Sequence, residues 1–133
     1  MSFVDEEDEP DPALNAITNA IIGAAIEVHR ELGPGHEELV YQKALAVEFA
    51  ARRIPFLSQH PIELLYKGHV VGQGRLDFLV EDRVVVELKS VEALARVHTG
   101  QALAYLRITG FRLAIVINFN VAKLIDGVRR VAL

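Results

Sequence analysis

The stretch that decides the fold of this chain is residues 74–89, which read GRLDFLVEDRVVVELK. A turn signal at Glu81-Asp82 divides this stretch in two. On both sides of it we expect successive side chains to point to opposite faces, as they do in a β-strand. We therefore expect an antiparallel hairpin of strands 69–80 and 83–89. One face of the first strand is expected to carry Leu76, Phe78 and Val80.

The register of this hairpin decides whether Asp77 and Glu87 meet. A three-residue turn over 81–83 places them directly opposite each other on one face, with Cβ atoms about 4.5–5.5 Å apart. A two-residue turn pairs Asp77 with Val86 instead and turns it away from Glu87. In the first register the two carboxylates and Lys89 converge, and shielded carboxylates that close need a partner such as a divalent cation. An amphipathic hairpin with one solvated face carries the same pattern, so both interpretations stay open at this point.

Two helices are predicted before the hairpin. Residues 13–32 repeat apolar side chains at three- and four-residue steps, and Gly33-Pro34-Gly35 ends the helix. That stripe consists of Leu14, Ile17, Ile21, Ala24, Val28 and Leu32. A second helix is expected over about 36–53, and its inward stripe is expected to be Val40, Ala44, Val47 and Ala51.

The remaining elements complete an α/β sandwich. Residues 56–66 are rich in strand-forming side chains and are expected to add a third strand to an antiparallel meander. A helix over 97–109, a doubly covered apolar strand over 111–119 and a short strand over 123–131 follow. The predicted fold is a mixed central sheet with helices on both faces.

Composition limits the class of protein. The chain has 133 residues, 51% hydrophobic and 24% charged, which is typical of a globular domain. It contains no cysteine, which excludes disulfide frameworks, thiolate metal sites and cysteine nucleophiles. No apolar run approaches the ~20 residues that cross a bilayer. We therefore expect a cytoplasmic protein without a membrane partner, and a mean hydropathy of +0.25 favours a homodimer.

Charge separates the first residues from the rest. Six of the 18 acidic residues lie in 1–12, so residues 13–133 hold 12 acidic against all 14 basic residues. We expect 1–12 to be a disordered acidic tail and 13–133 to form one domain. The tail can serve solubility or can mimic nucleic acid at a basic groove, and the sequence does not decide between them.

Two further helical pairs are candidates for a site. Gly35, Glu38 and Tyr41 are spaced by three, so Glu38 and Tyr41 share one helical face. The helix macrodipole alone explains a glutamate at that position, and a helical tyrosine is usually part of a core. Gln101 and Tyr105 are spaced by four on the later helix, where packing is again the simplest explanation.

Together these segments resemble the GxxExxY protein family of the PD-(D/E)XK nuclease-like superfamily. The matching segments are 21–29, 32–41 with its Gly35-x-x-Glu38-x-x-Tyr41 spacing, 74–77, 84–89, Gln101, Tyr105 and 117–119. The resemblance implies a restriction-endonuclease-like core, α-βββ-α-β, with the first helix as an N-terminal addition.

The resemblance also implies roles for individual residues. Carboxylate ligands of Mg²⁺ or Mn²⁺ would be Glu38, Asp77 and Glu87, with the main-chain carbonyl of Leu88 as a further ligand. Lys89 would orient the attacking water or stabilise charge at the phosphate. Gln101 would position water or substrate, and Tyr105 and Tyr41 would support the site. No organic cofactor is implied.

The predicted function is metal-dependent hydrolysis of phosphodiester bonds in nucleic acid, DNA rather than RNA. Magnesium prefers oxygen ligands and keeps several waters, and a nearby ammonium stabilises the transition state. The alternative is a catalytically silent module with a nuclease fold that binds protein or nucleic acid.

Overall fold

The computed structural model describes residues 12–133, which form three helices and one five-stranded sheet. The order of elements along the chain is α1 (Pro12–Leu32), α2 (Glu38–Ala51), β1 (Phe56–Tyr66), β2 (His69–Val80), β3 (Val84–Lys89), α3 (Arg96–Thr109), β4 (Leu113–Asn118), the short 3₁₀ helix η2 (Leu124–Gly127) and β5 (Val128–Ala132). The acidic segment before Pro12 lies outside the described residues. None of the described helices combines the length and apolar character that crossing a membrane requires.

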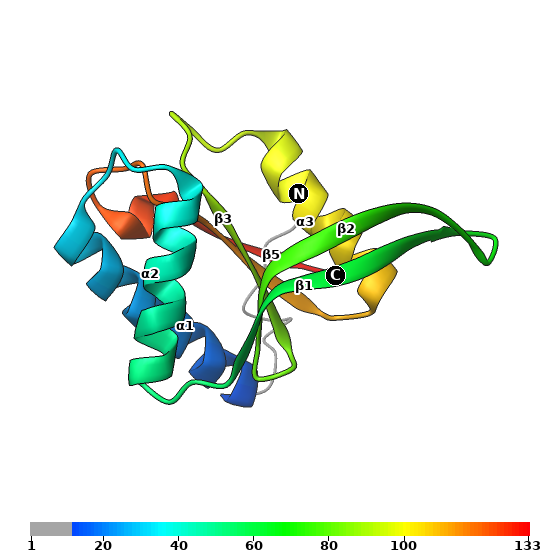
Figure 1. The fold of residues 1–133 in the computed structure, drawn as a ribbon, viewed down its shortest axis with the longest axis horizontal. Helices are drawn as coiled ribbons and strands as arrows, with labels where there is room; N and C mark the ends of the chain where they lie inside the picture. The colour runs from blue at the N-terminus through cyan, green and yellow to red at the C-terminus, as the bar shows by residue number, and fades with distance from the viewer. Residues whose placement is uncertain (1–11) are drawn as a thin grey trace.

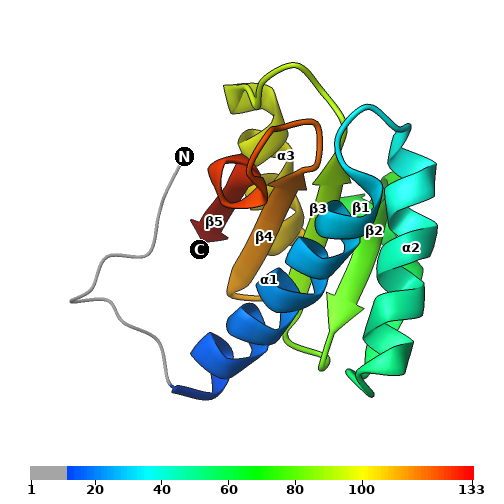
Figure 2. The ribbon, with the colours of Figure 1, turned by 90° about the vertical axis from the view of Figure 1, so that its left-hand side faces the viewer.

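The sheet is mixed and covered on both faces. Its strands are ordered β1-β2-β3-β4-β5, and every neighbouring pair is antiparallel except β3 and β4, which are parallel. Helices α1 and α2 lie on one face and α3 lies on the other (Figures 1 and 2). This confirms the expected α/β fold with a restriction-endonuclease-like core and an additional N-terminal helix.

Two apolar clusters hold the layers together. Side chains of α1 and α2, among them Ile21 and Phe49, form one buried cluster with Phe78 of the sheet. On the opposite face, Leu106 of α3 packs against Val116 of β4. Strands β3 and β4 lie between the two clusters, so Val84–Leu88 and the whole of β4 are buried, as their continuous apolar sequences predict.

The predicted face of the second helix and the predicted start of the last strand are wrong. The expected inward stripe of the second helix faces solvent at Val40 and Val47, while Tyr41, Leu45 and Phe49 are buried instead. The helix is apolar around most of its circumference, so periodicity alone did not identify its buried face. The last predicted strand is also shorter than expected, because η2 occupies its first residues.

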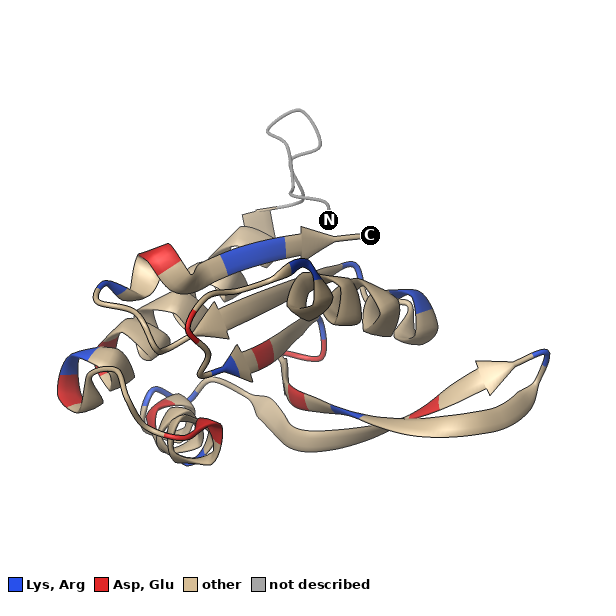
Figure 3. Ribbon diagram, turned by 90° about the horizontal axis from the view of Figure 1, so that it is seen from above, with Lys and Arg blue, Asp and Glu red and all other residues tan. Residues whose placement is uncertain are grey.

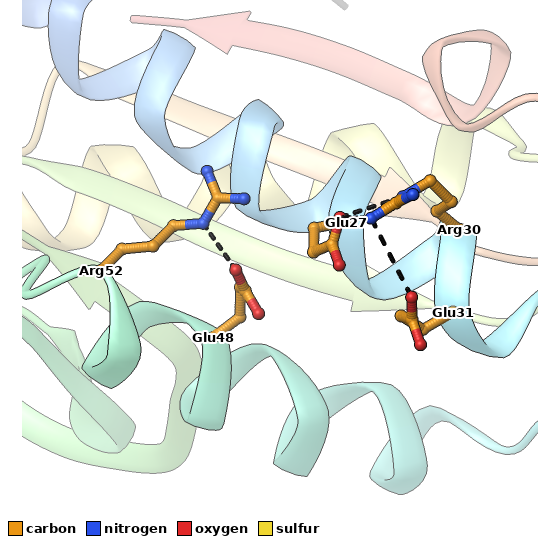
Figure 4. A network of polar contacts seen from close by, with 5 residues as sticks. All are labelled: Glu27, Arg30, Glu31, Glu48 and Arg52. Carbon is orange, nitrogen blue, oxygen red and sulfur yellow. Dashed lines mark hydrogen bonds and ion pairs between the residues drawn. The ribbon is translucent and has the colours of Figure 1, made fainter.

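The surface where α1 and α2 meet carries the ion pairs of Arg30 and Arg52 (Figure 4). Arg30 contacts Glu27 at 2.6 Å and Glu31 at 4.0 Å, and Arg52 contacts Glu48 at 2.6 Å. Each pair joins residues at most four positions apart, and both arginines are exposed, so the pairs add little to stability. The two helices therefore depend on their apolar contacts with each other and with the sheet.

The β1–β2 hairpin is longer than the strands beside it. It extends past α3 as a two-stranded arm (Figure 1), and its tip at Lys67-Gly68 is exposed. Only the base of this arm contributes to the cleft described next.

Candidate functional site

A cleft of about 510 Å³ opens where the base of the β1–β2 arm leaves the sheet. Its lining comes from five elements, α2, β1, β2, β3 and α3. The lining residues are Glu38, Gln59, Pro61, Gln73, Gly74, Arg75, Asp77, Glu87, Lys89, Gln101 and Tyr105. Six of the seven side chains predicted for the site therefore line one cleft, and Tyr41 is the exception.

The hairpin adopts the register that brings the carboxylates together. Val80 pairs with Val84 and Phe78 with Val86, so Glu81, Asp82 and Arg83 form the turn, and Asp77 lies opposite Glu87. The glutamate and aspartate at the turn both have positive φ, 53° and 59°. The three-residue turn is thus correct, and the alternative with Asp77 beside Val86 is excluded.

The two carboxylates replace the sheet hydrogen bonds at this point. The N–H of Asp77 donates to Oε2 of Glu87 at 2.9 Å, and the N–H of Leu88 donates to Oδ2 of Asp77 at 2.7 Å. Regular pairing of β2 with β3 ends one residue earlier, at Phe78 and Val86. Each bond uses one carboxylate oxygen, so Oδ1 of Asp77 and Oε1 of Glu87 take part in neither bond.

The alternation of side chains between the two faces of the sheet is interrupted in β2 at Asp77. Leu76 packs in the cluster under α3, whereas Phe78 packs in the cluster under α1 and α2, so the prediction that they share a face is wrong. On the neighbouring strand, pairing passes from Ser58 to His60, and the residue between them, Gln59, has a left-handed φ of 54°. This interruption opposite Asp77 breaks the alternation and opens the cleft.

Burial keeps the two carboxyl groups from ionising easily, and nearby negative charge adds to this effect. Burial, then the nearby charge of Asp77, raises the pKa of Glu87 to about 8, well above its ordinary value of 4.5. Burial also raises the pKa of Asp77, although the hydrogen bond from Leu88 and the charge of Lys89 oppose the shift. Burial, Glu87 and Asp77 likewise raise the pKa of Tyr105. The site thus favours a proton or a cation between the carboxylates.

Lys89 and Gln101 meet in the same cleft as the carboxylate pair. The Nζ of Lys89 donates to Oε1 of Gln101 at 3.4 Å, a long bond that links β3 to α3. Lys89 is partly buried and Gln101 is exposed. Both side chains line the cleft and carry N–H donors, which suits an anionic substrate.

Glu38 occupies the first position of α2 and lines the same cleft. Its charge contributes to the raised pKa values of Asp77 and Glu87. Within residues 12–133, however, no three Asp, Glu or His side chains are grouped closely enough to hold a metal ion. The predicted three-carboxylate ligand set is therefore not assembled in this structure.

The donors that are present still suit magnesium. Mg²⁺ is commonly held by one or two carboxylates and completes its octahedral shell with water. The carboxylates of Asp77 and Glu87 already lie side by side. In a strand the carbonyl of a residue points to the same edge as its N–H, so the Leu88 carbonyl also faces this gap. The donor set fits a hydrated Mg²⁺, with Glu38 available to bind through water.

Tyr41 lies outside the cleft and fixes the loop before α2. It is fully buried, and its ring stacks on Phe119 with centroids 4.4 Å apart. The hydroxyl donates to the Gly33 carbonyl at 2.6 Å and accepts the His36 N–H at 3.2 Å. These contacts set where α2 begins, and therefore where Glu38 lies.

We expect Tyr41→Phe to destabilise the fold without stopping any activity of the cleft. Losing the hydroxyl leaves the Gly33 carbonyl and the His36 N–H without their partner, which costs about 1–2 kcal/mol. Urea denaturation measures the loss, with exposed Tyr66→Phe as the control that should unfold like the wild type. Unchanged stability of Tyr41→Phe would contradict this structural role.

Three polar residues near the site were not predicted from the sequence. Gln42 donates to the main-chain carbonyl of Asp77 at 3.2 Å, and Gln59 lines the cleft. Buried Asn118 accepts from and donates to the main chain of Val91, which holds the loop after β3. Gln42 directly follows the spaced Gly-Glu-Tyr pattern, but no periodicity distinguishes a glutamine that binds the main chain from one on the surface.

Comparison with known proteins identifies one family. The family model described as the PD-(D/E)XK nuclease superfamily matches residues 15–131, nearly all of the described chain. No curated protein and no solved structure matches the chain.

Proposed function

Because the chain belongs to the PD-(D/E)XK nuclease superfamily, we propose that it is a metal-dependent nuclease that hydrolyses phosphodiester bonds. The observation that supports this most strongly is the opposed pair Asp77 and Glu87 in an open cleft, with Lys89 beside them. The proposed cofactor is Mg²⁺, replaceable by Mn²⁺. The proposed ligands are the carboxylates of Asp77 and Glu87, the Leu88 carbonyl and, through water, Glu38.

The side chains of the cleft divide the chemistry among them. When bound, the cation would lower the pKa of a water molecule bound to it and would draw charge from the phosphoryl oxygens. The carboxylates of Asp77 and Glu87 would bind this cation. They are not the groups that stabilise charge on the substrate. Lys89 places an ammonium where negative charge grows on the phosphate, which counts most in the transition state. Gln101 orients Lys89 through their hydrogen bond and can bind water or substrate, and Tyr105 forms the wall behind it.

Replacement of the ammonium is expected to slow cleavage strongly. We expect Lys89→Met to lower the cleavage rate about 100-fold, because one preorganised charge at the phosphate is lost, while Mn²⁺ binding persists. Single-turnover cleavage assays measure the change, and exposed Lys123→Met is the matched control. A Lys89→Met rate within threefold of wild type would contradict the proposed role.

The proposed substrate is DNA rather than RNA. The net charge of the protein should contribute little to its affinity for nucleic acid. Basic and acidic segments are interspersed over the described fold (Figure 3), and residues 13–133 carry a small positive excess. Sequence-independent affinity should therefore be weak and sensitive to salt. Single- and double-stranded DNA and RNA, each with Mg²⁺, Mn²⁺ or chelator, test the substrate, and cleavage that persists in chelator opposes the proposal.

A homodimer in the cytoplasm completes the proposal. Helix α2 leaves Leu39 58% and Val47 70% exposed, and these apolar side chains are available to an interface between two copies. Static light scattering tests the dimer directly, and a monomeric mass throughout the accessible concentration range opposes it.

A second candidate is a module that keeps the fold and does not cut. It is favoured by the observation that no group of three Asp, Glu or His side chains in residues 12–133 is poised to hold a metal. Calorimetric titration separates the two candidates, since the silent module predicts no Mn²⁺ binding heat and no cleavage of any nucleic acid.

A further inference from the structure

The main chain of Asp77 is held by side chains rather than by the sheet. Its N–H donates to the carboxylate of Glu87, and its carbonyl accepts the Nε2–H of Gln42 at 3.2 Å. In an uninterrupted strand both groups would pair with a neighbouring strand. On the β1 side Gln59 is left-handed and skipped by the pairing, and on the β3 side pairing ends at Phe78.

Of the two side chains that bind the main chain of Asp77, Glu87 comes from the sheet and Gln42 comes from a helix. Gln42 is 7% exposed and lies on the buried face of α2, one turn after Glu38. A buried amide is costly unless it is hydrogen-bonded, so this glutamine and the Asp77 carbonyl satisfy each other. The bond spans 35 positions in the sequence and fastens α2 to β2 at the residue that carries the carboxylate.

We infer that Gln42 is a positioning residue for the carboxylate pair, acting through the main chain of Asp77. This inference rests on the proposed metal site and adds a residue to it. Helix α2 therefore positions two residues of the site, Glu38 at its first position and Gln42 one turn later. Without the glutamine amide, the main chain of Asp77 loses its hydrogen bond to α2, and the position of its carboxylate beside Glu87 becomes less fixed.

The expected consequence is weaker metal binding in a protein that still folds. Groups that orient ligands from outside the coordination shell typically change metal affinity 10- to 100-fold. Gln42→Met has a similar length and no donor, and we expect its Mn²⁺ dissociation constant to rise about 10-fold. Amide hydrogen exchange should quicken at Leu88, whose N–H donates to the Asp77 carboxylate.

The control must lose stability without touching Asp77. Ile21→Val removes one methyl from the fully buried face of α1 and costs about 1 kcal/mol. Ile21→Val should have a lower melting temperature than wild type, but its Mn²⁺ dissociation constant should stay within twofold of wild type. The rate of amide hydrogen exchange at Leu88 should rise only as far as the loss of global stability explains. If Gln42→Met does not fold, Gln42→Asn, which keeps the amide but is one methylene too short, gives the same comparison.

The experiment is Mn²⁺ calorimetry on the full chain for wild type, Gln42→Met, Ile21→Val and Asp77→Asn. A 10-fold loss in Gln42→Met with none in Ile21→Val supports the positioning role. Wild-type affinity in Gln42→Met, or equal losses in both variants, overturns it. Wild-type affinity in Asp77→Asn overturns the metal site itself, so the two failures are distinguishable.

Discussion

Asp77→Asn is expected to reduce nucleic-acid cleavage about 1,000-fold or more, an effect of roughly 4 kcal/mol on the barrier. The amide has the shape of the carboxylate, and its oxygen can still accept the Leu88 N–H that Asp77 accepts at 2.7 Å. Its neutral side chain, however, binds a divalent cation far less strongly than a carboxylate. The fold should survive while metal-dependent chemistry is lost.

The matched control lies on the same hairpin. Asp82 is exposed in the turn, with a φ of 59° that asparagine tolerates well, so Asp82→Asn should cleave like wild type. Single-turnover assays in Mg²⁺ and circular dichroism melting compare the two variants. Equal activity of Asp77→Asn and Asp82→Asn would place the chemistry elsewhere.

The second large effect is a pH-dependent loss of stability in the metal-free protein. Glu87 has a pKa of about 8 in the fold and an ordinary value near 4.5 when unfolded. Between these values the folded chain keeps a proton that the unfolded chain has released. Stability is therefore fully present below about pH 4.5 and declines as pH rises toward 8, by at most about 1.4 kcal/mol per pH unit. The raised pKa of Asp77 acts in the same direction.

Glu87→Gln should remove most of this decline. Urea denaturation in chelator at pH 5, 6.5 and 8 should show falling midpoints for wild type and nearly constant midpoints for the variant, with exposed Glu92→Gln as control. Excess Mg²⁺ should restore the wild type at pH 8, because a ligand that binds the folded state stabilises it, and should leave Glu87→Gln largely unchanged. Parallel pH dependence of wild type and Glu87→Gln would rule out the buried carboxylate as its source.

Much of this architecture could be predicted from residues alone, because local patterns dictate it. The alternation on both sides of Glu81-Asp82 favours a hairpin, and the apolar run of β4 favours a strand covered on both faces. Charge spacing on β3 also placed Glu87 and Lys89 on one face. The match to a nuclease family over residues 15–131 agrees with that order of elements.

The parts that could not be predicted depend on tertiary contacts. The buried face of α2 is chosen by packing on α1 and the sheet, since Val47 and Leu45 are equally apolar in the sequence and only Leu45 is buried. The reversal of β2 at Asp77 depends on the left-handed residue on β1 and on the Gln42 amide, each distant in sequence. Tyr41 was expected at the site only from the family resemblance, since its spacing alone favoured a core position, and its hydroxyl binds the loop before α2.

The most direct test of the account is a crystal grown or soaked with Mn²⁺ and measured at a wavelength where manganese scatters anomalously. We expect one anomalous peak in the gap that Asp77, Glu87 and the Leu88 carbonyl share. A fully occupied peak at any other site, or an empty gap at saturating Mn²⁺, would contradict the assignment of these side chains as the metal centre of a nuclease.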